Sequence, residues 1–236
     1  MSKSARFERR ERAEYLVSAM IGASVRRGVL LAWGLLGAGC AHGMKVPEKV
    51  AANPVLEAER RGGLKERELA LGGAVASDIE RDWNRPLGRG LVHFEQAPEE
   101  TTLAFSFKHP QGTLAGHCTE HLKSNLMGLK NPKVSLACTC KDGDRSLGEV
   151  ALEQSQGSAE LAGGGAYRVY GIYTASNGRK RDEVLGYWFL SQAGEGAVEL
   201  KGEGRAWLPP NVSPEQRPAL LCLYAAMLLY RPGEAK

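Results

Sequence analysis

The sequence lacks most of the features that would mark an enzyme or a polytopic membrane protein. The motifs G-x-S-x-G, H-E-x-x-H, G-x-x-x-x-G-K-[ST] and S-x-x-K, which accompany common nucleophilic, zinc and phosphate-binding sites, are all missing. No apolar run reaches the roughly 20 residues that a membrane-spanning helix needs, and no repeat of 20–50 residues occurs. We therefore predict no catalytic residue, no metal ligand and no cofactor.

An excess of charge is also missing from most of the chain. Residues 1–40 hold seven basic and three acidic residues, which accounts for the whole net charge of +4 and leaves 24 of each sign in the remainder. With no excess of positive charge, this part of the chain lacks the main feature that favours binding to nucleic acid. What remains is a 236-residue chain with 43% hydrophobic and 25% charged residues, an ordinary composition for a globular protein with one core.

The N-terminal region reads as a targeting segment. Arg26 and Arg27 precede GVLLAWGLLGAGC, whose apolar stretch 29–38 would span roughly 15 Å as a helix at about 1.5 Å per residue. That length suits the hydrophobic region of a signal peptide. Residues 1–39 are therefore predicted to be a signal peptide, and Met20 is an alternative start because residues 20–33 alone make a normal one.

The end of this segment resembles the lipobox of bacterial lipoproteins. Ala38 and Gly39 are the small residues that precede the lipobox cysteine, here Cys40, although Gly37 stands where a leucine is commoner. The resemblance implies cleavage before Cys40 and its acylation with palmitate-like chains, so that the membrane is one partner. It also favours the periplasmic face of the outer membrane, because Ala41 rather than an acidic residue follows the cysteine.

The rest of the chain is predicted to have an α+β fold, mainly an antiparallel β-sheet in a sandwich or small barrel. We expect a lipidated tether at 40–54, a lead-in of short helices at 55–90, and the β domain at 91–236. Residues 103–107 alternate apolar and polar side chains, as a half-buried strand does. Asn177-Gly178 is the preferred pair for a hairpin turn within 165–191.

A buried helix is predicted at the C-terminal end, over residues 214–231. Ser213 is a favourable N-cap residue, Pro214 suits the first helical position, and Gln216 completes a capping box. From Ala219 to Tyr230 the segment is apolar on every side, so it must be covered by other parts of the protein. We expect it to dock on the open face of the sheet.

Four cysteines remain if Cys40 carries lipid: Cys118, Cys138, Cys140 and Cys222. An even number in an exported protein suggests two disulfides. A bridge between Cys138 and Cys140 is the least favourable, because residues i and i+2 of a strand lie about 6.5–7 Å apart. The other two pairings stay open. An alternative hypothesis makes the cysteines a thiol or metal site with His117 and His121, although no established metal spacing is present.

Two surface or cavity features complete the prediction. The run Arg179-Lys180-Arg181 is typical of a solvated turn, but it would also be able to contact anionic lipid or another envelope polymer. Six aromatic residues are typical of an ordinary core but could line a ligand cavity in a barrel: Tyr167, Tyr170, Tyr173, Tyr187, Trp188 and Trp207.

The functional hypothesis is an envelope lipoprotein that acts as a non-catalytic binding or assembly module, with an envelope protein as partner. Two alternatives stay open. The first is a β-barrel that binds a small apolar ligand, and the second is a thiol or metal protein that uses Cys118, Cys138 and Cys140.

Overall fold

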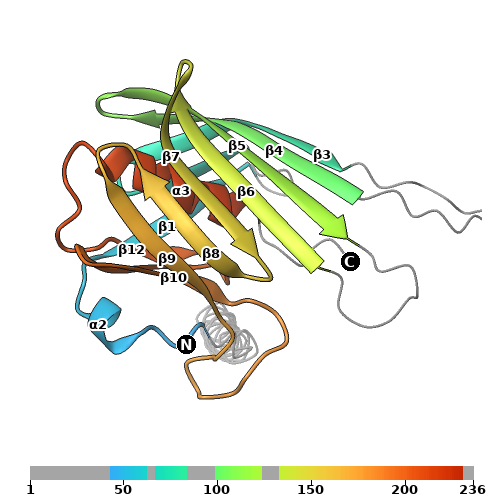
Figure 1. The fold of residues 1–236 in the computed structure, drawn as a ribbon, viewed down its shortest axis with the longest axis vertical. Coiled ribbons are helices and arrows are strands. Elements are labelled where there is room, and N and C mark those ends of the chain that lie inside the picture. The colour runs from blue at the N-terminus through green and yellow to red at the C-terminus, as the bar shows by residue number, and fades with distance from the viewer. Residues whose placement is uncertain (1–42, 63–66, 84–98, 124–132, 231–236) are drawn as a thin grey trace, which may run out of the picture. The chain divides into compact units, whose positions relative to one another are not determined.

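The structure of the protein, a computed structural model, describes residues 43–62, 67–83, 99–123 and 133–230 (Figure 1). The predicted signal peptide and Cys40 lie outside these ranges. The described residues form a closed barrel of twelve strands in which every neighbouring pair is antiparallel. The strands are β1 Val55–Arg61, β2 Glu68–Leu71, β3 Ala74–Trp83, β4 Glu99–His109, β5 Gly112–Lys123, β6 Lys133–Asp142, β7 Arg145–Glu153, β8 Gln156–Leu161, β9 Gly165–Ile172, β10 Gly186–Ser191, β11 Gly194–Glu199 and β12 Arg205–Trp207.

Consecutive strands pair with one another around the barrel, and β1 closes it by pairing with both β2 and β12. Alternation along the strands separates the interior from the outer wall. Leu103, Phe105 and Phe107 of β4 are buried, as the sequence pattern predicted. Mainly antiparallel β structure is therefore confirmed, but the barrel is larger than the small one expected.

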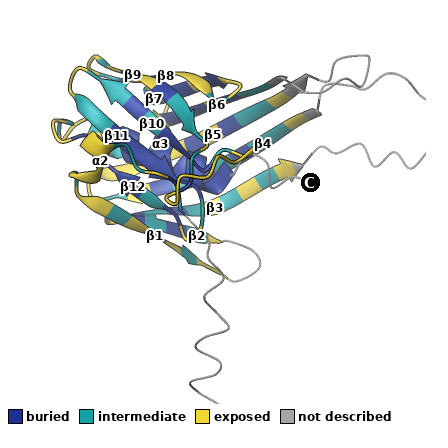
Figure 2. Ribbon diagram, turned by 90° about the horizontal axis from the view of Figure 1, so that it is seen from below, coloured by how far each residue is buried: buried dark blue, intermediate teal, exposed yellow. Residues whose placement is uncertain are grey.

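A helix, α3 (Arg217–Tyr230), occupies the lumen of the barrel (Figures 1 and 2). All twelve residues from Ala219 to Tyr230 are buried, and α3 contacts β2 to β7 and β11. The predicted capping is present, since the backbone N–H of Gln216 donates to Oγ of Ser213 over 3.2 Å. Docking on an open sheet face was wrong, because a closed wall surrounds the helix. A barrel of eight strands is filled by side chains alone, so twelve strands leave room for a helix.

Two arginines from the wall close the C-terminal end of α3. Arg60 of β1 donates to the carbonyl of Leu228 over 2.9 Å, and Arg81 of β3 donates to that of Leu229 over 3.0 Å. The last carbonyls of a helix have no partner inside the helix and carry partial negative charge. The two guanidinium groups give these carbonyls hydrogen-bond donors and place positive charge beside their partial negative charge.

The short helices predicted for residues 55–90 were wrong, because the described part of this region forms β1, β2 and β3. In β1 the alternation of charged and apolar residues has a period of two, with Leu56 and Ala58 turned inward between exposed glutamates. Ser77 lies in β3 beside a bulge at which Asp78 has a φ of 52°. In the described part of the N-terminal region, one short helix is present, α2 (Glu48–Ala51).

The outer wall carries a second, smaller buried cluster. Its buried members come from the N-terminal segment, from the 173–185 loop and from β11 and β12: Met44, Val50, Ala175, Leu185, Ala197 and Trp207. Residues 43–53, predicted as part of a tether, thus pack against the barrel, with α2 beside β11 (Figure 2). Among the described helices, neither is long and apolar enough to cross a membrane.

Candidate functional site

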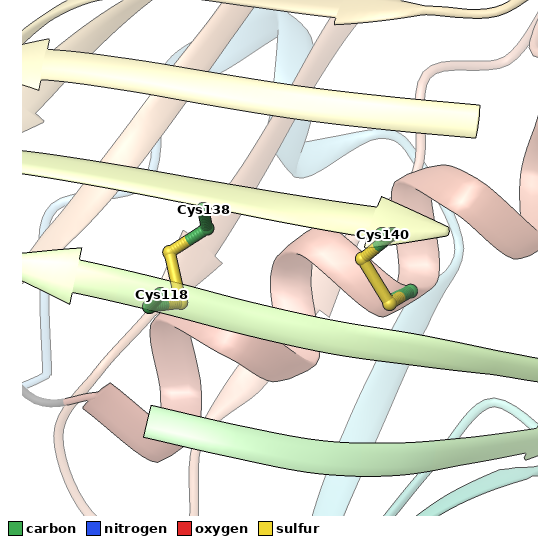
Figure 3. The surroundings of a disulfide bond; sticks show 4 residues. Cys118, Cys138 and Cys140 are labelled. Carbon is green, nitrogen blue, oxygen red and sulfur yellow. A yellow bond between two sulfur atoms is a disulfide. The ribbon is translucent and has the colours of Figure 1, made fainter. Parts of the chain in front are cut away.

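The four candidate cysteines form two disulfides inside the barrel (Figure 3). Cys118 of β5 and Cys138 of β6 stand directly opposite each other in register, with their Cα atoms 4.0 Å apart. Cys140 of β6 bonds Cys222 of α3 across a Cα–Cα distance of 6.2 Å, and so ties the helix to the wall. The prediction of two disulfides is confirmed, and the pairing judged least favourable, Cys138 with Cys140, is not the one formed. Two disulfides indicate an oxidising, exported compartment.

The arrangement of these residues does not assemble a thiol or metal centre. All four cysteines are fully buried and oxidised, so none presents a thiolate. His117 is exposed on the outer wall, whereas Cys118, its neighbour in β5, points into the lumen. In the part of the chain that the structure describes, no three His, Cys, Asp or Glu side chains gather to hold an ion.

The six candidate aromatic residues are divided between the two sides of the wall. Tyr167 and Tyr187 are buried in the lumen, where Tyr167 packs edge-on against Phe189. The remaining four lie outside the lumen: Tyr170 packs near Trp188 on the outer wall, Trp207 belongs to the outer cluster, and Tyr173 is exposed in the 173–185 loop. The structure therefore brings them to no common cavity.

A small polar group lies in the lumen near the C-terminal end of α3. Glu120 of β5 is hydrogen-bonded to Tyr230, and Tyr187 is hydrogen-bonded to Ser155. Burial raises the pKa of Glu120 above its ordinary value, and the Tyr230 hydrogen bond opposes that shift. Burial also raises the pKa of both tyrosines, so their hydroxyl groups stay protonated. Sequence reasoning missed Glu120, although the period of two from Leu114 to Cys118 already placed it on the inner face.

A buried carboxylate on the outer wall fixes the N-terminal segment. Glu199 is 2% exposed and accepts hydrogen bonds from Nε and Nη2 of Arg205, both over 2.6 Å, and from the backbone N–H of Met44. The Glu199 hydrogen bond raises the pKa of Arg205, which also lies over the Trp207 ring at 5.3 Å. A side chain at Gly43 would clash with the carboxylate, since a Cβ there would lie 2.2 Å from Oε1. Sequence reasoning missed this clamp, because no local pattern marks Glu199.

Backbone hydrogen bonds attach the same segment to the 173–185 loop. Lys45 N–H donates to the carbonyl of Thr174 over 2.7 Å, and Ser176 N–H donates to that of Gly43 over 2.8 Å. The loop turns at Asn177-Gly178, where Gly178 has a φ of 82° that favours glycine. The predicted turn pair is thus in a turn, but within a loop longer than a tight hairpin.

Between the segment and the loop lies an open hollow of about 600 Å³. Three cations, one exposed tyrosine and apolar side chains line it, with no carboxylate among the described lining residues. We call it the basic hollow; its main lining residues are Lys45, Pro47, Ile172, Tyr173, Lys180 and Arg181. It combines two features that the sequence placed far apart, the lysine after the lipobox-like motif and the basic run of the loop.

Comparison of this chain with family models, with curated proteins and with solved structures finds no match. A functional conclusion therefore depends on the residues of the chain itself, and the basic hollow with its neighbouring Glu199 clamp is the strongest candidate site among the described residues.

Proposed function

We propose that the protein is an exported lipoprotein of the bacterial envelope, anchored through Cys40, whose barrel acts as a non-catalytic binding or assembly module. The two disulfides support export, since such bonds persist in oxidising compartments. The lipobox-like residues before Cys40 support the anchor, and several acyl chains at about 0.8 kcal/mol per buried CH₂ would hold the protein on a bilayer. With Ala41 after the cysteine, we assign it to the periplasmic face of the outer membrane.

The occupied lumen is the observation that carries the choice of a binding module. Barrels that transport or store small molecules keep an interior cavity. Here α3 fills that place, and Cys140–Cys222 holds it there. The surface offered to partners is consequently the outer wall and the loops, which is the surface of an interaction module.

Metabolic labelling tests the anchor. Cells grown with radiolabelled palmitate should yield a labelled product that has been cleaved before Cys40, and Cys40→Ala should abolish the label and leave a larger, uncleaved chain. His42→Ala, two residues away, is the matched control and should be labelled normally. An unlabelled wild-type protein, or one released entirely into the medium, would refute the proposal.

A barrel that binds a small apolar ligand is the second candidate, because the wall encloses an apolar interior with Tyr167 and Tyr187. Such a ligand would have to share the lumen with α3. Native mass spectrometry of the purified protein separates the two functions: a bound apolar molecule supports the carrier, and a bare chain supports the interaction module.

A further inference from the structure

The basic hollow lies close to the position where the proposed lipid anchor begins. Gly43 is held by the carbonyl contact with Ser176, and Met44 forms an isolated β-bridge with Ala175. Gly43 is the third residue after Cys40, so a fully extended chain between them spans at most about 11 Å at 3.6 Å per residue. An acyl group on Cys40 would therefore bring this loop to the surface of the bilayer.

The charge around the hollow suits an anionic surface. Lys45, Arg179, Lys180 and Arg181 are all exposed, and none forms an ion pair with another described residue. The nearest carboxylates along the loop are Asp182 and Glu183, and Glu183 is paired with Lys201 at 2.9 Å. Glu48 is exposed on α2, while Lys49 is occupied by Glu195 at 3.3 Å. Unpaired cations thus outnumber unpaired carboxylates on this face.

The hollow also has a volume and an aromatic side chain that suit a lipid headgroup. Its volume of about 600 Å³ falls within the range of about 300–1,000 Å³ found for small-ligand sites. Tyr173 is 38% exposed on its rim, one of few large hydrophobic side chains so exposed in the described structure. Tyrosine is enriched at membrane interfaces, where its ring lies at the level of the headgroups.

We propose that the basic hollow binds the phosphate of anionic phospholipids and so sets this end of the barrel against the membrane. The inference rests on the lipid anchor proposed above. Each Lys or Arg near an anionic leaflet strengthens binding by about fivefold, so three should contribute roughly 100-fold to the docking equilibrium. The segment 43–53 then acts as a short, fixed strap rather than a long spacer, because the Glu199 clamp holds it to the wall.

The lipidated protein, reconstituted into vesicles, tests this orientation. A spin label is placed at Asn177→Cys in the loop, and the control label at Asp144→Cys in the β6–β7 turn, at the opposite end of the strands. Vesicles are either pure phosphatidylcholine or equal parts phosphatidylcholine and phosphatidylglycerol. In the mixed vesicles the label at 177 should lie at headgroup depth, while the label at 144 should stay in water.

Charge variants give the decisive comparison. The first is a triple variant, Arg179→Gln with Lys180→Gln and Arg181→Gln. It should lower the equilibrium constant for docking of the loop by roughly 100-fold, so that the label at 177 moves into water. The matched triple variant Lys108→Gln, Lys141→Gln and Arg145→Gln removes three exposed cations at the far end and should leave docking unchanged. Salt raised from about 0.1 to about 1 M shortens the Debye length from about 10 to about 3 Å and should also release the loop.

The contrary outcomes are distinct. If the anchored protein shows the same water exposure at 177 in both kinds of vesicle, the anchor stands and the docking face is refuted. If inorganic phosphate at constant ionic strength displaces the loop, the hollow is a pocket for free phosphate and not a membrane contact. A chain that fails to float with pure phosphatidylcholine vesicles would refute the anchor, and the docking face with it.

Discussion

The lumen and the outer wall beneath the N-terminal segment are both buried, but they are held together in different ways. In the lumen, α3 packs mainly against apolar side chains of the wall and is bonded covalently to β6. On the outer wall the short segment 43–53, here called the cover, lies over a small cluster. It is attached through the Glu199 carboxylate, a few backbone hydrogen bonds, and contacts of Lys49 and Asn53 with Glu195. Apolar packing and a disulfide hold α3 in the lumen, whereas hydrogen bonds and ion pairs contribute much of what holds the segment 43–53 on the outer wall. The cover should therefore open in a separate, earlier step than the barrel.

The largest effect should come from separating α3 from the wall. Replacing Cys140 and Cys222 together with Ala removes a link that closes 82 residues, worth about 4.5 kcal/mol in the chain-entropy model. The matched variant, Cys118→Ala with Cys138→Ala, removes a disulfide that closes a loop of only 20 residues. It should lower the free energy of unfolding by about 3 kcal/mol. Urea unfolding of both variants measures the difference. A smaller loss for the 140–222 pair would mean that packing alone keeps α3 in the lumen.

Cavities made on the two sides sharpen the comparison. Leu223 of α3 is fully buried in the lumen, and Leu223→Ala should destabilise the whole fold by about 3 kcal/mol. Met44→Ala removes a similar side chain from the outer cluster, where the thin cover can collapse onto the gap, and should cost less than half as much. Equal losses in thermal and urea unfolding would contradict the idea of a separately held cover.

The clamp itself should control only the cover. Glu199→Ala leaves the Met44 N–H without its acceptor, while Arg205 can still reach water because its side chain is 40% exposed. A loss of about 1–3 kcal/mol is expected, confined to the segment. Hydrogen exchange should accelerate in residues 43–53 and remain slow in α3. Lys49→Ala, which removes only an exposed ion pair with Glu195, is the control and should change exchange less. Equal acceleration in α3 would show that cover and barrel unfold together.

Local patterns in the sequence predicted the parts of this fold that depend on neighbours in the chain. The alternation at 103–107 predicted β4, and Ser213 with Gln216 predicted the start of the C-terminal helix. The apolar surface all around that helix predicted that it is buried. The cysteine spacing made the Cys138–Cys140 bridge the least favourable pairing, and it does not form.

Features that depend on distant residues were not predictable. The charges of β1 fit both a helix and a strand, and its partners β2 and β12 decide between them. The barrel closes only through the pairing of β1 with β12, and no local sequence pattern predicts that pairing. Because the wall is closed, the C-terminal helix lies inside the lumen and not on an open sheet face. The candidate site behaves in the same way. The basic run Arg179-Lys180-Arg181 was recognisable in the sequence. The roles of Lys45 and Glu199 were not, because they depend on the packing of the N-terminal segment on the wall.

The smallest effect concerns Glu120, a carboxylate that lies at one end of the apolar lumen. Burial raises the pKa of Glu120 above its ordinary value near 4.5, so Glu120 binds its proton more tightly in the folded state than in the unfolded chain. The contribution of Glu120 to stability is then fully present below pH 4.5 and is lost as the pH rises through the raised pKa. Glu120→Gln keeps a polar partner for Tyr230 without the charge, so its gain in unfolding free energy over the wild type should grow from acid to neutral pH. Glu153→Gln, an exposed site, should give no such trend, and a flat difference for Glu120→Gln would mean that water reaches this end of the lumen freely.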